Sequence, residues 1–246
     1  MFHLKLRFGL LLTVLALALP AWAEETIDSV EKKLAEASGK IKAISYKMTM
    51  VSDMTFEGGS SKGESVTLYE LQKAGEKFKF RSDTKTSGVT KAGGQEMKMD
   101  STMLLVCDGE FTYTLSEMMG QKMAQKAKLD PAQDGLSLKS TFAMLRKDYN
   151  LKILPDEKVD GKDCFVIEAA AKDANSPVAK LVYYFAKDLG IMLKSVNSDK
   201  DGKPTTTITT ADVKLDPTFP PDRFTFKAPA GVEVTDRTKE TAPEKQ

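Results

Sequence analysis

An alternation of apolar and polar residues with a period of two is the feature that most constrains how this chain folds. It runs through residues 46–51, 77–81 and 111–116, where apolar side chains recur at every second position. Successive side chains of a strand point to opposite faces of a sheet. Each segment is therefore predicted to be a β-strand with one apolar face.

Glycine-containing pairs separate these apolar segments. An Asp-Gly or Gly-Gly pair supplies the positive φ angles that a two-residue hairpin turn needs. Strands joined by successive hairpins form an antiparallel meander, so one long antiparallel sheet is predicted. The pairs are Gly58-Gly59, Gly93-Gly94, Asp108-Gly109, Asp160-Gly161, Leu189-Gly190 and Asp201-Gly202.

Two segments change to a helical period. From Glu25 to Ala37 apolar residues recur at helical spacing, and Ser38-Gly39 closes the segment, which predicts an amphipathic helix. Apolar residues recur in the same way over residues 138–145, after Asp130-Pro131, a pair suited to a helix start. The predicted fold class is mainly β with α: a single antiparallel sheet with an N-terminal helix and a helical insertion midway.

The first 23 residues have the features of a secretory signal peptide. Lys5 and Arg7 precede an apolar run over residues 8–19, and Pro20-Ala21-Trp22-Ala23 offers a small-residue cleavage site, so cleavage is expected after Ala23. The apolar run is shorter than the roughly 20 residues that span a bilayer. The product is expected in an exported compartment, a bacterial periplasm.

The chain beyond the leader is expected to form one domain. No linker or tandem repeat divides residues 24–234, whereas residues 235–246 are polar and are expected to be a disordered tail. The full chain has 36 Lys+Arg against 35 Asp+Glu. Nucleic-acid binding rests on an excess of clustered basic residues, so a nucleic acid is not an expected partner.

Catalysis by histidine is excluded after cleavage, because His3 is the chain's single histidine and lies in the leader. A Ser-His-Asp mechanism and an imidazole zinc site both need that residue type. Most of the candidate acids, such as Asp108 and Asp201, fall in turns, where aspartate serves backbone geometry. The chain is not predicted to be an enzyme, and no cofactor or metal is expected.

Two cysteines leave two alternatives open. Cys107 immediately precedes one Asp-Gly pair, and Cys164 follows another. An oxidising compartment permits a structural disulfide between them. Two separate buried thiols fit the sequence equally well, and the spacing does not suit redox catalysis.

Methionine is abundant, and three interpretations compete for it. Pairs such as Met97 and Met99 place thioethers on one face of a strand, as an ordinary core would. Flexible thioethers also suit a cavity that adapts to ligands of varied shape. Binding of Cu(I) is the third and least favoured interpretation. Beyond the leader the methionines are Met48, Met50, Met54, Met97, Met99, Met103, Met118, Met119, Met123, Met144 and Met192.

Several segments resemble LolA-like outer-membrane lipoprotein carriers. Residues 181–196 resemble that family's strand, turn and strand, and residues 106–113 resemble its Asp-Gly hairpin leading into an aromatic strand. Residues 224–236 resemble the family's ending, in which an F-x-F strand leads through proline and glycine to a last short strand. The leader, first helix and helical interruption occur in the matching order, so the resemblance covers nearly the whole chain after the leader.

The resemblance implies an unclosed, curved half-barrel whose short helices form a lid over an apolar cavity. Such a protein binds the acyl chains of lipoproteins or lipids and shuttles them from an inner-membrane exporter to an outer-membrane acceptor. We expect a monomer. An alternative is a regulatory module that senses lipoproteins and contacts a membrane protein, because the fold is shared more widely than the cargo. A structural envelope protein with a filled core is a third possibility.

Face alternation and the resemblance together predict the lipid-binding residues. A one-residue error in register would exchange any strand's set for its neighbours. The resemblance also assigns a lid latch to Arg81, or to Lys79 if the register differs by two. The predicted lipid-binding residues are Met48, Met50, Phe78, Phe80, Met97, Met99, Leu105, Phe111 and Tyr113 on strands and Phe142 and Leu145 on the lid.

Overall fold

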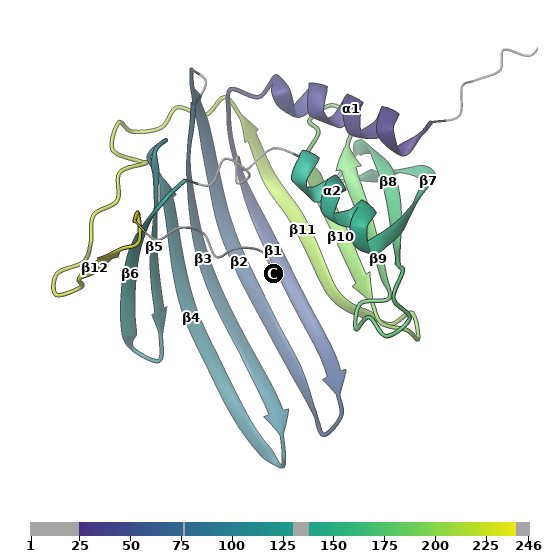
Figure 1. Ribbon diagram of the computed structural model, residues 1–246, viewed down its shortest axis with the longest axis horizontal. Helices are drawn as coiled ribbons and strands as arrows, with labels where there is room; N and C mark the ends of the chain where they lie inside the picture. The colour runs from purple at the N-terminus through teal and green to yellow at the C-terminus, as the bar shows by residue number, and fades with distance from the viewer. Residues whose placement is uncertain (1–24, 76, 130–137, 240–246) are drawn as a thin grey trace, which may run out of the picture.

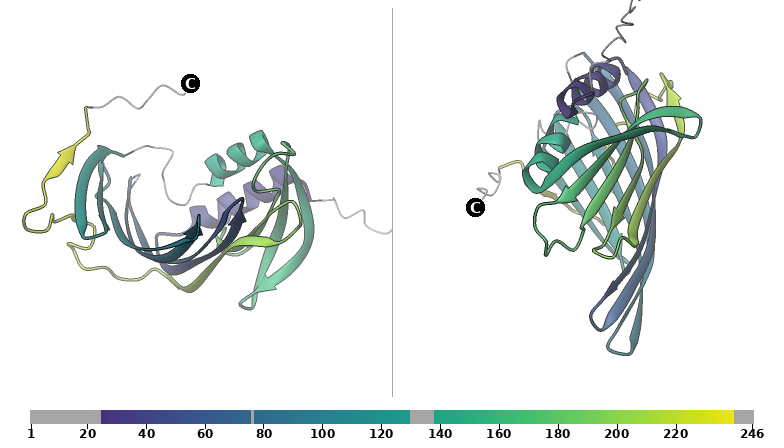
Figure 2. Two further views of the ribbon diagram at one scale, coloured as in Figure 1. Left: turned by 90° about the horizontal axis from the view of Figure 1, so that it is seen from below. Right: turned by 90° about the vertical axis from the view of Figure 1, so that its right-hand side faces the viewer.

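The protein is described by a computed structural model that covers residues 25–75, 77–129 and 138–239. Within these ranges twelve strands form one sheet that does not close into a barrel. The sheet is strongly curved, and both helices lie on its concave side (Figures 1 and 2). The predicted fold class, a mainly β protein with an unclosed sheet and an N-terminal helix, is confirmed.

The elements follow the order predicted from the sequence. Helix α1 (Ile27–Gly39) comes first. The next six elements are the strands β1 (Ala43–Phe56), β2 (Gly59–Ala74), β3 (Lys77–Ala92), β4 (Gln95–Cys107), β5 (Phe111–Met118) and β6 (Gln121–Lys128). They are followed by α2 (Leu138–Asp148), β7 (Tyr149–Val159), β8 (Lys162–Ala171), β9 (Lys180–Ala186), β10 (Met192–Ser198), β11 (Pro204–Leu215) and β12 (Val234–Asp236).

The sheet contains two meanders rather than the single one predicted. Its strand order is β12-β6-β5-β4-β3-β2-β1-β11-β10-β9-β8-β7. Strands β1 to β6 form one meander, β7 to β11 form the other, and antiparallel pairing of β1 with β11 joins them, with Met50 opposite Ile208. The single-meander prediction is wrong because this pairing joins strands far apart in the sequence, which local turn signals do not reveal.

The predicted turns lie between strands, and at least one glycine of each predicted pair adopts a positive φ angle. Gly58 has φ 79° between β1 and β2. Asp160 and Gly161, at 49° and 77°, form the two-residue connection between β7 and β8 that the Asp-Gly pair predicted. Met119 and Gly120 adopt the same signs between β5 and β6, a turn that the sequence interpretation missed.

Helix α1 begins two residues later than predicted. Thr26 is its N-cap: the Thr26 hydroxyl accepts a hydrogen bond from the Ser29 amide at 3.1 Å, and the Ser29 hydroxyl accepts one from the Thr26 amide at 3.0 Å. The second predicted helix is confirmed as α2, while its expected start at Asp130-Pro131 lies outside the described residues, as does the expected leader. No described helix is long and apolar enough to cross a membrane.

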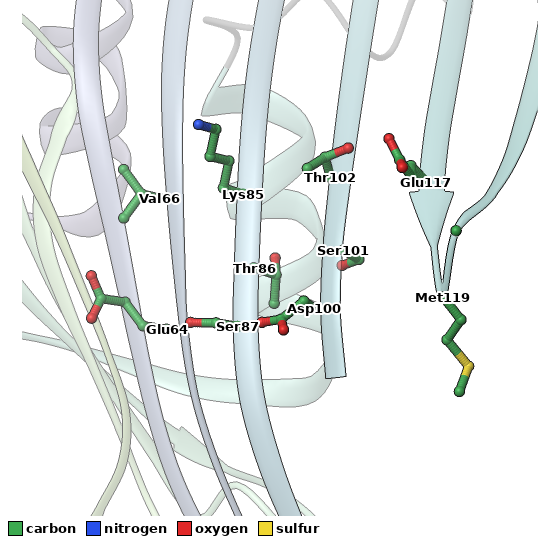
Figure 3. Close-up of a pocket in the computed structure, with 11 residues that line it drawn as sticks. Glu64, Val66, Lys85, Thr86, Ser87, Asp100, Ser101, Thr102, Glu117 and Met119 are labelled. Atoms are coloured by element: carbon green, nitrogen blue, oxygen red, sulfur yellow. The ribbon is translucent and has the colours of Figure 1, made fainter. Parts of the chain in front are cut away.

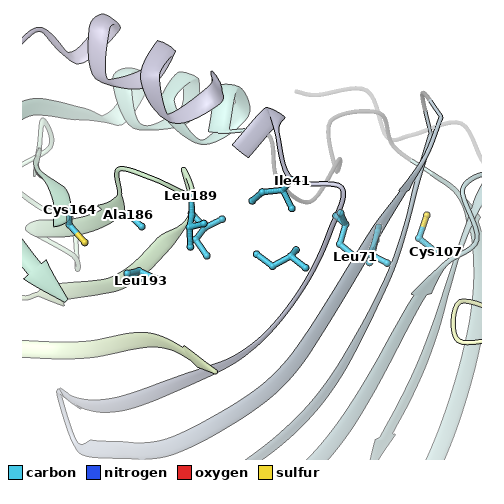
Figure 4. Packing of buried hydrophobic residues seen from close by; sticks show 10 residues of the cluster. Ile41, Leu71, Cys107, Cys164, Ala186, Leu189 and Leu193 are labelled. Carbon is cyan, nitrogen blue, oxygen red and sulfur yellow. The ribbon is translucent and has the colours of Figure 1, made fainter. Parts of the chain in front are cut away.

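The helices are fixed to the half of the sheet formed by β7 to β10. Val30 and Leu34 of α1 and Phe142 of α2 form a buried cluster with residues of β8 and β9, including Phe165 and Phe185. A second buried cluster extends from β9 and β10 past Ile41 to β2 and β4 (Figure 4). Burial of these apolar side chains removes them from water and holds the two meanders together.

The C-terminal segment, residues 216–236, crosses the convex side of the sheet (Figure 2). It ends in β12, whose Val234 lies opposite Ala124 in parallel pairing with β6, the one parallel pair among the described strands. Beyond this strand the Arg237 amide donates to the Lys126 carbonyl oxygen at 2.8 Å. The predicted disordered tail from residue 235 is therefore wrong at its start, because the first residues of that range pair with the sheet.

Candidate functional site

The strand registers decide which side chains share the concave face. Ile44, Leu71, Phe80 and Cys107 are neighbours across β1, β2, β3 and β4, and all four are buried in the cluster beneath the end of α1. Side chains two positions apart on each strand point the same way. The concave face of this meander therefore carries the even-numbered residues of β1, β3 and β5 and the odd-numbered residues of β2, β4 and β6.

Exposed methionines gather on this concave face. Eight of the described methionines are exposed, and six of them belong to the concave set by register, with exposed fractions between 43% and 59%. The two others are Met119, in a turn, and Met144, on α2. With the half-buried Met48 and Met50, the methionine face comprises Met48, Met50, Met54, Met97, Met99, Met103, Met118 and Met123.

The methionines form two groups with small polar residues between them. One bank consists of the methionines on β1, Met48, Met50 and Met54, and the other of those on β4 to β6, Met97, Met99, Met103, Met118 and Met123. In one row across the sheet Met48 on β1 and Met103 on β4 flank Thr67 and Thr84. Further along the strands Met54 and Met97 flank a second pair of hydroxyl residues in the same manner. The face thus offers two flexible apolar surfaces separated by the width of β2 and β3.

Stacked aromatic rings close the methionine face toward the core. The ring centroids of Tyr46 and Tyr69 lie 5.0 Å apart, and Phe80 lies 6.1 Å from both Tyr69 and Phe78. Burial raises the pKa of the Tyr46 phenol, which therefore stays neutral at physiological pH. This end of the concave face is aromatic, whereas the other ends of β1 to β4 extend away from both helices (Figure 1).

Most of the strand residues predicted to bind lipid share the concave face. Register places Met48, Met50, Phe78, Phe80, Met97, Met99 and Leu105 there. Their predicted contact with lipid stays a prediction. The sequence interpretation did not choose Met54, Met103, Met118 or Met123 for this site. Two of them could have been found from the alternation, because Met54 is an even number of positions from Met48 and Met103 is two positions from Leu105.

The assignment of Phe111 and Tyr113 to this face is wrong. Thr112 lies opposite Cys107, so the two aromatic residues beside it point to the convex face. There the Tyr113 ring stacks on Phe226 of the C-terminal segment with centroids 5.2 Å apart. The C-terminal segment thus covers the Tyr113 ring, which gives this side chain a structural role.

The two predicted lid residues on α2 are part of the core. Phe142 and Leu145 are 0% and 1% exposed. Leu145 packs against Ala169 and Leu181, and the Phe142 ring lies 5.9 Å from that of Phe185. Neither side chain is open to a ligand in this structure, because α2 rests directly on β8 and β9.

The lid-latch assignment is also wrong. Arg81 lies on the convex face, opposite in direction to Phe80, and its guanidinium donates two hydrogen bonds, at 2.7 and 2.9 Å, to the carboxylate of Asp83. Lys79 lies two positions from Arg81 on the same strand, so its side chain also points away from the helices. The guanidinium of Arg223, in the C-terminal segment, completes this charge cluster by binding Glu70 at 2.5 Å and approaching Asp83 at 3.7 Å.

Cys107 and Cys164 are separate, buried thiols, so the disulfide alternative is not realised. They lie at opposite ends of one buried cluster, with Leu189, Ile41 and Leu71 between them (Figure 4). Burial raises the pKa of both thiols, which keeps them protonated and unreactive in the folded protein.

A hollow of about 770 Å³ lies on the convex face, over strands β2 to β5 (Figure 3). Its lining includes the carboxylates Glu64, Asp100 and Glu117 and the ammonium of Lys85. An acyl chain placed here would have to displace the water that hydrates these charged groups. Among the residues that the structure describes, no three His, Cys, Asp or Glu side chains converge as metal ligands.

Parts of the chain are similar to proteins described as uncharacterized. A family model described as an uncharacterized protein matches residues 140–227. An uncharacterized protein of Methanocaldococcus jannaschii is 31% identical over 134 residues, which is 54% of this chain and 37% of that protein. The chain therefore spans little more than a third of this curated relative.

Solved structures with a similar fold include MucB, which has a TM-score of 0.43 and 14% identity over 85% of this chain and 64% of its own. A LolA superfamily protein is also among them. That protein, from Nitrosomonas europaea, has a TM-score of 0.27 and 13% identity, and the match covers 82% of this chain and 98% of the other. The family that the sequence resembles is represented among these structural neighbours.

Proposed function

We propose that the methionine face binds the acyl chains of lipoproteins or lipids and that the protein carries them through the periplasm. The observation that carries this proposal is the concentration of exposed methionines on the concave face. Six of the eight exposed methionines in the described residues lie there. Exposed apolar side chains gathered on one face of a protein mark a site of interaction. Thioether side chains adapt to ligands of different shape, which suits chains of varied length and saturation.

The magnitude of apolar burial favours an acyl ligand over a charged one. Each buried CH₂ group contributes about 0.8 kcal/mol, whereas an exposed ion pair contributes about 0–1 kcal/mol. Several chains held in this way would not leave a bilayer quickly without help. An inner-membrane exporter on the donor side and a better-binding outer-membrane acceptor are therefore part of the proposal.

The test compares two sets of methionine variants. Met97→Gln/Met99→Gln/Met103→Gln removes the three methionines that β4 contributes to the methionine face, and Met119→Gln/Met144→Gln changes the two exposed methionines that lie elsewhere. Full burial of a methionine contributes about 1.5–3 kcal/mol, so half-exposed side chains lose about 1 kcal/mol each. Affinity for dansylundecanoic acid, measured by fluorescence titration, is expected to fall about 100-fold in the triple variant and to stay unchanged in the control.

Equal affinities of the two variants would contradict the proposed site. Native mass spectrometry of protein purified from its own envelope separates a carrier from a structural protein, because a carrier retains a lipid or acylated peptide. Deletion of the gene then tests transport. Accumulation of lipoproteins at the inner membrane is expected for a carrier, and their correct delivery would favour the sensing module.

A further inference from the structure

Three pairs of hydroxyl side chains line the centre of the concave face, between the two methionine banks. Their oxygens are joined across β2 and β3: Thr67 to Thr84 at 2.9 Å, Ser65 to Thr86 at 2.7 Å, and Ser61 to Thr90 at 3.1 Å. We call these three pairs the hydroxyl ladder. Between its last two pairs Gly63 lies opposite Gly88, so the row there has no side chain.

Each pair leaves one hydrogen-bond donor unused. A hydroxyl group has one hydrogen to donate and two lone pairs to accept with. The bond within a pair uses one of the two hydrogens, and the ladder hydroxyls have no second hydrogen-bond partner among the described residues. The ladder therefore presents three free donors, in a line along the strands, on the face that is proposed to receive the ligand.

These donors restrict what the ligand can be. A ligand made only of hydrocarbon would cover the donors and separate them from water, which costs binding free energy for each donor left unsatisfied. A ligand with carbonyl oxygens would accept hydrogen bonds from these donors in place of the displaced water. The acyl chains of such a ligand would contact the methionines on either side of the ladder. Met48 and Met103, for example, flank the pair of Thr67 and Thr84.

We propose that the hydroxyl ladder recognises the ester carbonyl oxygens of a diacylglyceryl group whose chains lie on the methionine face. This inference rests on the proposed function and narrows it to ester-linked acyl ligands. The free hydroxyls of neighbouring ladder pairs donate to the two ester carbonyl oxygens of the ligand, and the thioethers supply the apolar contact. Free phospholipids and the lipid anchor of a lipoprotein share this chemistry.

The test uses lipids that differ only in their carbonyl groups. A diester phosphatidylglycerol with two palmitoyl chains and its diether analogue, which lacks both ester carbonyls, are titrated against the full chain in lipid nanodiscs. The wild-type protein is expected to bind the diester about 5- to 10-fold more tightly, as one or two hydrogen bonds would provide. A diacylated lipopeptide is the third ligand, and tighter binding of it than of the phospholipid would identify a lipoprotein as the source.

A double variant links this preference to the ladder. Thr67→Val/Thr84→Val removes both hydroxyls of one pair while nearly preserving side-chain shape. Thr49→Val/Thr209→Val makes the same change in a cross-strand threonine pair on the convex face. The first variant is expected to lose about 5-fold in affinity for the diester and none for the diether, and the second to match the wild type with both lipids.

The outcomes separate the two proposals. Equal binding of diester and diether by the wild type overturns the inference about the ladder and leaves acyl binding intact. Equal loss for both lipids in the Thr67/Thr84 variant also overturns it, because the change would then have acted through the shape or stability of the sheet. Failure of the wild type to bind either lipid overturns the proposed function, and with it this inference.

Discussion

Replacement of Gly190 by alanine tests how closely the turn between β9 and β10 packs against α1. Gly190 has φ 64°, and a Cβ atom built on it would lie 2.1 Å from the carbonyl oxygen of Leu34 and 2.8 Å from the amide nitrogen of Ser38. Ordinary contact begins near 3.4 Å. The turn and the helix would have to separate by about 1.3 Å, the difference between 3.4 and 2.1 Å.

The expected loss has two parts. A left-handed conformation costs an alanine about 1–2 kcal/mol. Separation of α1 from the sheet loosens the contacts of Val30 and Leu34, both 0% exposed, and a core loosened by a cavity loses about 2–4 kcal/mol. Together these give a decrease of about 3–6 kcal/mol in the free energy of unfolding.

Urea unfolding followed by circular dichroism measures this decrease, and Gly202 provides the matched control. Gly202 also has a positive φ angle, 78°, but a Cβ there would meet no atom within 4 Å. Gly202→Ala is expected to lose only the conformational part, about 1–2 kcal/mol. Equal losses in the two variants would refute the close approach of the turn to α1.

Two further predictions concern the charge cluster and pH. Arg223→Ala leaves Glu70, whose side chain is 12% exposed, without its ion-pair partner and is expected to destabilise the protein by about 1–3 kcal/mol in urea unfolding. Lys227→Ala, which changes a largely exposed pair, should lose at most about 1 kcal/mol, and an equal loss would count against the cluster. Burial raises the pKa of the Cys107 thiol, which is neutral when protonated, so stability is full below the ordinary thiol pKa of about 8.5 and declines above it. A urea midpoint that stays constant up to about pH 10 would contradict this linkage.

The sequence predicts those parts of the fold that depend on neighbouring residues. Period-two alternation identified the concave residues of β1, β3 and β4, and the Asp160-Gly161 pair identified its hairpin, because side-chain direction and turn geometry are local properties. Leu189-Gly190 and Asp201-Gly202 were equivalent as turn signals. That α1 packs on Gly190 and leaves Gly202 open follows only from the tertiary structure.

The errors in the candidate site have a common cause. Phe111 and Tyr113 are apolar and alternate correctly, but the C-terminal segment provides Phe226 as a partner on the convex face, so the apolar side of β5 is not the concave side. Arg81 and Asp83 likewise lie on the face that the segment crosses, where Arg223 of the segment approaches Asp83. A single strand's pattern does not say which of two faces is covered, because that depends on residues more than a hundred positions away.

The two outer strands of the sheet bear on how the protein avoids polymerising. An unpaired strand edge is a template on which another copy can add by backbone hydrogen bonding. Here β12 occupies part of the outer edge of β6, while β7, at the opposite end, is interrupted by a register shift between Leu154 and Glu157 that includes Pro155, which has no amide hydrogen to donate. Neither end offers a long regular edge, so an open twelve-stranded sheet can remain dispersed at high concentration instead of growing into fibres.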